Sequence, residues 1–270
     1  MDLGLADATT VVNGGTRGMG RAAAESLARE GARVAVLART QAALDETVEA
    51  VMSLGSPDAV GISTDLTSRE AVDRAFASVA ERWGSLNALV NAAGPIGVGI
   101  GGFDTIDDEE WHATFDIGTL SAARCVRAAL PLMRSAPWGR IVNISAHSTK
   151  RQSAELVAYT AAKAALTSLS KNLSASLAPE GILVNTVSPG SFLSEGMRGY
   201  LRALPPERGV DAESLVDAMR VISEDFGHPA HIGRAADPRE IGPLIAFLCS
   251  QANTYMTGAN LNIDGGSDFT

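Results

Sequence analysis

The sequence predicts an α/β fold, in which one domain holds a doubly wound parallel sheet of about seven strands with helices on both faces. Short apolar runs alternate with helical stretches along the chain, and no tight hairpin signal separates them. Parallel strands need such long crossover connections. A chain of 270 residues that is 46% hydrophobic can bury one large core, and no linker divides residues 1–270.

The first strand, expected over residues 9–12, leads into a glycine-rich turn and then a helix. Residues 13–20 read Asn-Gly-Gly-Thr-Arg-Gly-Met-Gly. Glycines let backbone N–H groups approach an anion, and the positive end of the helix dipole attracts it. The spacing differs from the usual dinucleotide fingerprint Gly-x-Gly-x-x-Gly. The turn therefore predicts a phosphate site, with helix packing alone as the alternative.

The second strand, expected over 33–38, bears on the choice of cofactor. An acidic residue at its far end would bind the ribose hydroxyls of NAD and repel the 2′-phosphate of NADP. Here the chain reads Ala38-Arg39-Thr40, and Arg17 in the glycine turn could reach the same phosphate. We expect NADP(H) to be favoured over NAD(H); the alternative is that both arginines are solvated surface residues.

Two further strands are expected over 59–65 and 86–90. Thr67 and Glu70 have the spacing of a capping box for the helix between them. After the second of these strands come Asn91-Ala92-Ala93-Gly94 and a glycine-rich stretch over 97–103. Ligands of open α/β sheets bind at the carboxyl ends of the strands, so this stretch is expected to border a substrate pocket. The apolar residues expected at this rim of the pocket include Ile96, Val98 and Phe103.

A fifth strand over 140–145 precedes a helix that contains Tyr159 and Lys163. Four residues apart, the two side chains share one helix face and can converge. A phenol with a pKa of about 10 can exchange a proton with a carbonyl or alcohol oxygen if a neighbouring ammonium stabilises the phenolate. The pair alone is also compatible with an ordinary helix.

The glycine turn, Asn91-Ala92-Ala93-Gly94 and the Tyr-x-x-x-Lys pair, in this order, resemble the short-chain dehydrogenase/reductase family over essentially the whole chain, with 3-oxoacyl-ACP reductase-like members among the similar ones. The resemblance implies a Rossmann-type fold and Tyr159 as the acid/base, with Lys163 lowering the pKa of Tyr159 and holding the nicotinamide ribose. The positions expected to bind the cofactor are Gly14, Thr16, Arg17, Gly18, Met19, Arg39, Asp65, Leu66, Asn91, Ala92, Gly94, Tyr159, Lys163, Pro189, Gly190, Phe192 and Ser194. Phe192, through its backbone, and Ser194, through its hydroxyl, are expected at the nicotinamide carboxamide.

Two positions depart from the family pattern. The family usually has Ser at the place of Ala146, where it hydrogen-bonds the substrate carbonyl, and Asn at the place of Gly118, where it helps hold a water. Side chains alternate along a strand, so Ser145 should point away from the side that Ala146 faces. Ser148, just beyond the strand, is the expected third catalytic residue, with His147 as the second choice.

A long mixed segment over about 191–232 follows the sixth strand. Long insertions at a binding rim are usually lids, so we expect a helical flap that selects the substrate. Met197 and Met219 are expected to make this flap apolar, whereas His228 and His231 are expected to be structural or solvated. The family resemblance also implies a homotetramer.

Composition limits the partners. The net charge of −9 and the pI near 5.0 argue against nucleic acid and anionic membranes. No apolar run approaches the ~18 residues of a membrane span, and the N-terminus carries acidic residues rather than the positive charge of a signal peptide, so a cytoplasmic protein is expected. Two cysteines without Cys-x-x-Cys spacing predict buried thiols, and the four histidines give no metal signature.

The main hypothesis is an NADP(H)-dependent oxidoreductase that interconverts a carbonyl and a secondary alcohol on a fairly apolar small molecule or acyl thioester. One alternative is a reductase of an activated C=C bond, for which the missing Ser matters less. The other is a dinucleotide-binding protein without turnover, which the changes at Ala146 and Gly118 favour and the retained Tyr159 and Lys163 oppose.

Overall fold

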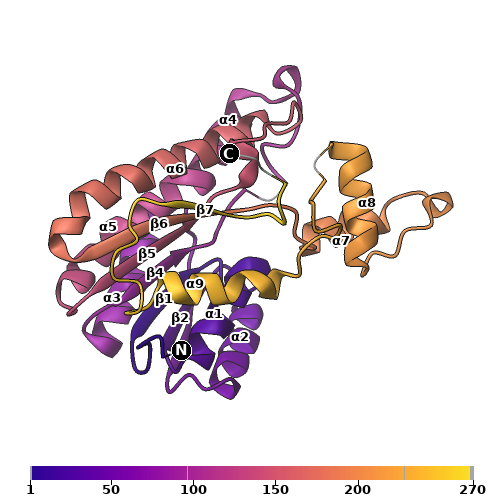
Figure 1. The fold of residues 1–270 in the computed structure, drawn as a ribbon. Helices are drawn as coiled ribbons and strands as arrows, with labels where there is room; N and C mark the ends of the chain where they lie inside the picture. The colour runs from indigo at the N-terminus through magenta and orange to yellow at the C-terminus, as the bar shows by residue number, and fades with distance from the viewer. Residues whose placement is uncertain (1, 96, 228, 268–270) are drawn as a thin grey trace.

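The computed structural model describes residues 2–95, 97–227 and 229–267, and these form a seven-stranded, fully parallel sheet between layers of helices (Figure 1). The strand order is β3-β2-β1-β4-β5-β6-β7. The strands are β1 Thr9–Asn13, β2 Arg33–Ala38, β3 Ala59–Ser63, β4 Ala88–Asn91, β5 Gly139–Ile144, β6 Ile182–Pro189 and β7 Asn260–Ile263. The order reverses between β1 and β4, so the doubly wound sheet expected from the sequence is confirmed.

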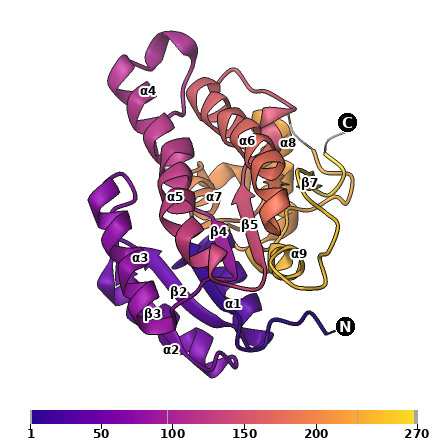
Figure 2. The same ribbon diagram turned by 90° about the vertical axis from the view of Figure 1, so that its left-hand side faces the viewer.

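Helices cover both faces of the sheet, as Figure 2 shows in the turned view. The α-helices of the described residues are α1 Gly18–Arg29, α2 Gln41–Ser53, α3 Arg69–Trp83, α4 Asp108–Phe115, α5 Ser121–Arg134, α6 Val157–Leu177, α7 Glu195–Arg202, α8 Leu215–Phe226 and α9 Gly242–Leu248. A π-helical turn over Asp116–Leu120 joins α4 to α5. No helix among the described residues has both the length and the apolar character to cross a membrane.

The apolar core is split into two layers by the alternation of side chains along the strands. Val12 and Val90 pack with α1, α2 and α9 on one face, whereas Val11 and Leu89 pack with α3 and α5 on the other. All four side chains are fully buried. The strands have near-continuous apolar sequences because helices cover the sheet on both faces.

Three buried asparagines form a row at the carboxyl ends of the central strands. Asn13 lies opposite Asn91, and Asn91 lies opposite Asn143, in the parallel register. The Asn13 amide donates to Asn91 Oδ1, the Asn91 amide donates to Asn143 Oδ1 at 2.7 Å, and the Asn143 amide donates to Ser170 Oγ of α6 at 2.8 Å. The row fixes β1, β4 and β5 to α6 directly beneath the rim where ligands bind.

Replacing Asn143 by Ala should lower the free energy of unfolding by about 2 to 4 kcal/mol, because the Asn91 amide and the Ser170 hydroxyl lose a buried partner and a cavity forms. Urea unfolding followed by circular dichroism measures this. Asn172→Ala, on the exposed side of the same helix, is the control and should change the value by less than about 0.5 kcal/mol. Equal effects of the two substitutions would contradict a structural role for the row.

The segment expected to form a flap contains α7 and α8, which stand beyond the carboxyl ends of the strands and away from the sheet (Figure 1). It has an apolar cluster of its own: Leu193, Leu201, Ala218, Met219, Val221, Ala230 and Ala235. Met197 packs against this cluster, and Met219 Sδ accepts the Ala230 N–H at 3.2 Å. The two methionines therefore make the segment apolar in its own core.

One prediction about the start of α3 needs correction. The N-cap is Ser68, whose Oγ accepts the Ala71 N–H, while the Thr67 hydroxyl donates to Asp65 at 2.7 Å. The capping box expected at Thr67 is absent because the helix begins one residue later. Ile96 and His228 lie outside the described residues.

Candidate functional site

The glycine turn between β1 and α1 packs tightly against the end of β4. Gly14 has φ +66°, and a Cβ there would lie 2.8 Å from the backbone nitrogen of Ala93. The Gly14 N–H donates to Leu37 O at 2.8 Å, which ties the turn to β2 as well. Only glycine meets both the positive φ and the close approach, so the turn is built into the switch point of the sheet.

The N-terminus of α1 fits an anionic group. Its N-cap, Arg17, makes no side-chain cap, and the first turn contains no acidic residue. A Cβ at Gly18, which has φ +54°, would meet no atom of the described residues within 4 Å. The first N–H groups of this 12-residue helix thus have neither a side-chain cap nor an acidic neighbour in the first turn, and with the helix dipole behind them they fit the phosphates of a dinucleotide.

Arg39 and Asp65 follow two neighbouring strands, β2 and β3, and both are exposed. The N–H and hydroxyl of Thr67 hydrogen-bond Asp65 and lower the pKa of its carboxyl, and the positive charge of Arg39 lowers it further. Leu66, next in the chain, is buried. The structure therefore brings Arg39 and Asp65 together, on the side of β1 opposite to β4.

The end of β4 is held by the side chain of Asn13. Asn13 Oδ1 accepts the N–H groups of both Ala92 and Ala93 at 3.0 Å. A Cβ at Gly94 would lie 3.0 Å from Lys163 Nζ, so the absence of a side chain lets the lysine pass. Asn91, Ala92 and Gly94 thus connect the glycine turn to the Tyr-x-x-x-Lys helix.

Lys163 and Tyr159 lie one turn apart in α6, at the carboxyl edge of β5. Lys163 is 3% exposed and its Nζ donates to Ile144 O at 2.8 Å. Burial lowers the pKa of Lys163 to about 8 and raises the pKa of Tyr159 to about 12. The lowering of the pKa of Tyr159 that was expected from Lys163 is thus not found, because burial is the cause that shifts it. At neutral pH the phenol carries its proton and can act as an acid.

Ser148 is the residue predicted to replace the usual serine, with His147 as the second choice, whereas Ser145 is predicted to point away. Ser145 is engaged elsewhere, because its Oγ donates to Lys163 O at 3.0 Å and lies 2.8 Å from Thr167 Oγ1. Ser148 is 4% exposed, and its Oγ has no hydrogen-bond partner among the described residues. His147 is also buried. A buried hydroxyl without a partner is uncommon, which makes Ser148 the best available donor to a ligand.

At Gly118, where the family usually has asparagine, a side chain would be tightly packed. The residue is buried in the π-helical turn, and a Cβ would lie 3.0 Å from Ala162 Cβ and 3.2 Å from Pro95 Cγ. The neighbouring Thr119 hydroxyl donates to Ala162 O at 2.7 Å and fixes the turn against α6. Glycine at this position is therefore matched to close packing between the π-helical turn and α6.

The chain after β6 passes below the flap. The Gly190 N–H donates to Ile263 O at 3.0 Å, directly after Pro189, and Phe192 is buried beside Ala236. Ser194 is the N-cap of α7, where its Oγ accepts the Met197 N–H at 3.3 Å. The Ser194 hydroxyl can still donate its proton while it caps the helix.

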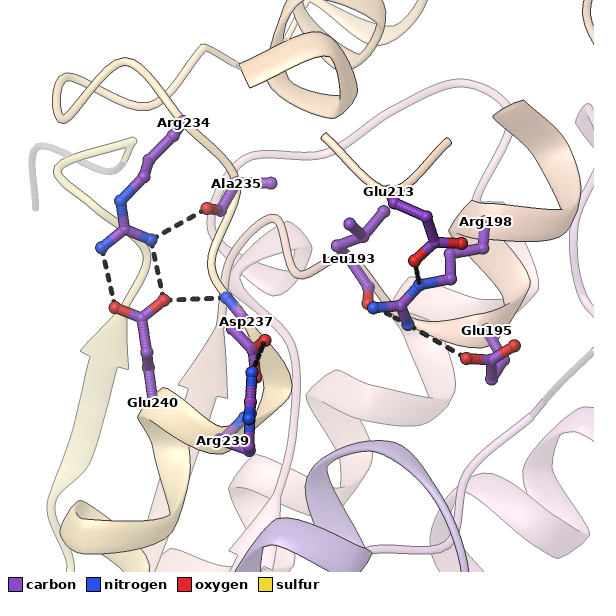
Figure 3. Close-up of polar contacts among 9 residues, drawn as sticks. All are labelled: Leu193, Glu195, Arg198, Glu213, Arg234, Ala235, Asp237, Arg239 and Glu240. Atoms are coloured by element: carbon purple, nitrogen blue, oxygen red, sulfur yellow. Dashed lines mark hydrogen bonds and ion pairs between the residues drawn. The ribbon is translucent and has the colours of Figure 1, made fainter. Parts of the chain in front are cut away.

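Ion pairs connect residues within the flap segment and connect the end of that segment to the helical turn that follows it (Figure 3). Arg198 of α7 pairs with Glu213 at 2.8 Å, and Arg234 forms two 2.7 Å contacts with Glu240. Glu240 also accepts the N–H of Asp237, whose side chain caps the next helical turn. A bidentate pair such as Arg234–Glu240 fixes the relative orientation of the two side chains in addition to bringing opposite charges together.

Sequence reasoning missed Asn143, Glu110 and Arg151. Asn143 could have been found, because it lies near the carboxyl end of an apolar strand, as Asn13 and Asn91 also do. The Arg151 guanidinium donates to Ser267 O and to Gly227 O, both at 2.9 Å, and so joins the segment after Ser148 to the end of α8. No local sequence pattern predicts these contacts of Arg151, because their partners lie far away in the sequence.

Comparisons with known proteins agree with this arrangement. The family model described as Enoyl-(Acyl carrier protein) reductase matches residues 14–268. Short-chain reductase protein NovJ of Streptomyces niveus is 34% identical over 260 residues, which cover 96% of this chain and 94% of that protein. Trans-4-hydroxycyclohexanecarboxylate dehydrogenase of Sinomonas cyclohexanicum is 33% identical over 267 residues, which cover 97% and 93%.

A solved structure shares the whole fold. L-sorbose reductase from Gluconobacter frateurii, complexed with NADPH and L-sorbose, superposes with a TM-score of 0.90 at 28% identity, over 99% of this chain and 98% of that one. The relatives are named as reductases and dehydrogenases. From its fold, its site and these relatives, the chain belongs to the short-chain dehydrogenase/reductase family and is an oxidoreductase of that family.

Proposed function

We propose that this oxidoreductase interconverts a carbonyl and a secondary alcohol with NADP(H), on a fairly apolar small molecule or acyl thioester. The observation that carries the proposal is the position of Lys163. Its ammonium lies buried between Ile144 O and Gly94, one helical turn from Tyr159 and near the end of β4 that the glycine turn contacts. A proton donor and a cation thus meet where the sheet binds its ligands.

The nicotinamide, when bound, supplies the hydride that goes to the carbonyl carbon. Tyr159 gives its phenolic proton to the carbonyl oxygen, which becomes the hydroxyl of the alcohol. Lys163 stabilises the phenolate that remains, and the Ser148 hydroxyl donates a hydrogen bond to the oxygen as negative charge develops on it. In the reverse reaction the phenolate takes the alcohol proton. The phenol is protonated at neutral pH, as its role as the acid in the reduction requires.

The glycine turn and the first turn of α1 would hold the phosphates. The residues involved are Gly14, Thr16, Gly18 and Met19, while Asn91, Ala92, Pro189, Gly190, Phe192 and Ser194 would border the nicotinamide half. Arg39 and Arg17, both exposed, would hold the 2′-phosphate, with Asp65 and Leu66 at the adenine. The preference for NADP(H) is supported by the lack of an acid at the end of β2 and by L-sorbose reductase, which was solved with NADPH.

Arg39→Ala should raise the Kd for NADPH about 10- to 100-fold and leave the Kd for NADH unchanged, because a charge-assisted contact to the 2′-phosphate is lost. Titration of nicotinamide fluorescence measures both constants. Arg29→Ala is the control. It removes an arginine at the C-terminal end of α1, roughly 16 Å along the helix from the N-terminus that is proposed to bind the phosphates. An equal loss for NADPH and NADH would contradict the assigned role of Arg39.

The apolar character of the substrate is supported by the rim after β4. Phe103 is 71% exposed and Ile100 is 61% exposed, whereas Val98 is half-buried. Exposed large apolar side chains that gather near a ligand edge are typical of a binding surface. Together with the flap over 191–232, which we propose to be the substrate lid, they would favour a substrate with a hydrocarbon body.

The experiment that tests the proposal follows NADPH and NADH consumption against hydrophobic ketones, β-ketoacyl thioesters and enones. Turnover of a ketone with NADPH, and weak turnover with NADH, is the expected result. Tight binding of NADPH with no consumption on any member of the panel would contradict it.

Reduction of an activated C=C bond is the second candidate. The matching family model is described as an enoyl reductase, and Ala146 has no hydroxyl to polarise a carbonyl. This reaction also needs a hydride and a proton, but the hydride goes to the β carbon. A saturated product from an enone or an enoyl thioester would favour it over the first candidate.

A further inference from the structure

The rim loop after β4 caps the helix that carries Tyr159. Leu156, the N-cap of α6, provides no side-chain cap. Instead the Tyr159 N–H donates to Gly99 O at 3.2 Å, and the Gly101 N–H donates to Glu155 O at 2.8 Å. The first turn of a helix has N–H groups without partners, so these backbone contacts fix where α6 begins.

Positive φ values allow the loop to reach this position. Gly99 has φ +73° and Gly101 has φ +153°. A Cβ at Gly99 would lie 2.7 Å from both Oγ1 and Cγ2 of Thr114, in α4. The loop is therefore a thin layer between two helices, with α4 on one side and the first turn of α6 on the other.

Glu110 of α4 holds this layer in place. Its Oε1 accepts the Gly99 N–H at 2.8 Å, and its own N–H donates to the N-cap Asp107 at 2.9 Å. In a capping box, the carboxylate at this helical position turns back to the N–H of the N-cap residue. Here it bonds Gly99 instead, with the greater strength of a charge-assisted bond.

We propose that Glu110 is a positioning residue for Tyr159. Its carboxylate fixes the Gly99 N–H, the Gly99 carbonyl fixes the Tyr159 N–H, and the phenol is thereby aligned with Lys163 and the substrate oxygen. The proposal rests on the proposed function of Tyr159. Small displacements of a reacting group reduce rates strongly, so one lost hydrogen bond at the loop should be visible in turnover.

The test compares three variants with the parent enzyme. Glu110→Ala should lower kcat about 10- to 100-fold with the KM for NADPH unchanged, because only the alignment of Tyr159 is lost. Glu110→Gln should recover most of kcat, since an amide oxygen still accepts the Gly99 N–H. Glu109→Ala removes an exposed carboxylate from the same first turn of α4 and should behave like the parent.

A second measurement does not depend on turnover. Amide hydrogen exchange in the protein without substrate should be faster at Gly99 and Tyr159 in Glu110→Ala, and unchanged in Glu109→Ala. This readout holds even if no substrate is turned over, so it separates failure of the positioning role from failure of the proposed function. If Glu110→Ala does not fold, Glu110→Met keeps the length of the side chain and lacks the carboxylate.

Two results would overturn the proposal. One is unchanged exchange at Tyr159 in Glu110→Ala or, if that variant does not fold, in Glu110→Met. The other is a Glu110→Gln variant as impaired as Glu110→Ala, which would mean that the negative charge at the start of α4 matters rather than the contact with Gly99.

Discussion

Tyr159→Phe should lower NADPH-dependent turnover by about 100- to 10,000-fold, because the ring stays in place while the only proton that can reach the substrate oxygen from α6 is lost. Lys163, whose Nζ donates to Ile144 O, is assigned the role of stabilising the phenolate rather than of giving the proton. The Kd for NADPH should change by less than about tenfold, because one neutral hydrogen bond is at stake. Stopped-flow absorbance of NADPH measures the turnover, and fluorescence titration measures the Kd.

Tyr255→Phe is the matched control, because this tyrosine is 98% exposed. It should leave both values unchanged. A Tyr159→Phe variant that keeps a tenth or more of the parent rate would show that another group protonates the substrate.

Ser148→Ala should lower kcat about 100- to 1,000-fold, as the loss of a preorganised donor to a developing oxyanion does. Its effect on the free energy of unfolding should be near zero or favourable, because the Ser148 hydroxyl is buried without a partner among the described residues. Rates at saturating NADPH test the predicted loss of kcat. Urea unfolding curves test the predicted free energy of unfolding separately.

Ser145→Ala should have the opposite effects, lowering stability but leaving kcat nearly unchanged. The Ser145 hydroxyl contacts Lys163 O and Thr167 Oγ1, so its removal should lower the free energy of unfolding by about 1–2 kcal/mol. The proton donor itself is untouched, and kcat should stay within about fivefold of the parent. If Ser145→Ala were the catalytic loss and Ser148→Ala the structural one, the assignment of the two serines would be reversed.

Most of the fold could be predicted because its signals are local and repeated. A strand such as β2 is a continuous apolar run ended by Arg39, and the crossover helix before it ends near Gly31; the same pattern recurs down the chain. The start of α3 was missed by one residue because Thr67 and Ser68 both carry a hydroxyl that can cap a helix. Choosing between them requires the path of the preceding loop, which the sequence does not state.

The candidate site was predictable only in part. Tyr159 and Lys163 are linked by helical spacing, so their proximity follows from the sequence. Glu110 and Gly99 meet only because glycines of positive φ turn the rim loop back toward α4. That Met197 and Met219 pack in a cluster of the flap segment itself also depends on how this segment folds on itself, which no local spacing states.

The central claim is that hydride and proton are added across a carbonyl. The most direct test gives the enzyme an α,β-unsaturated ketone and NADPH deuterated at both C4 positions, and locates the deuterium in the product by NMR. The account predicts an allylic alcohol with deuterium on the carbinol carbon and the C=C bond intact. A saturated ketone with deuterium on the β carbon would contradict it and establish the enoyl reaction instead.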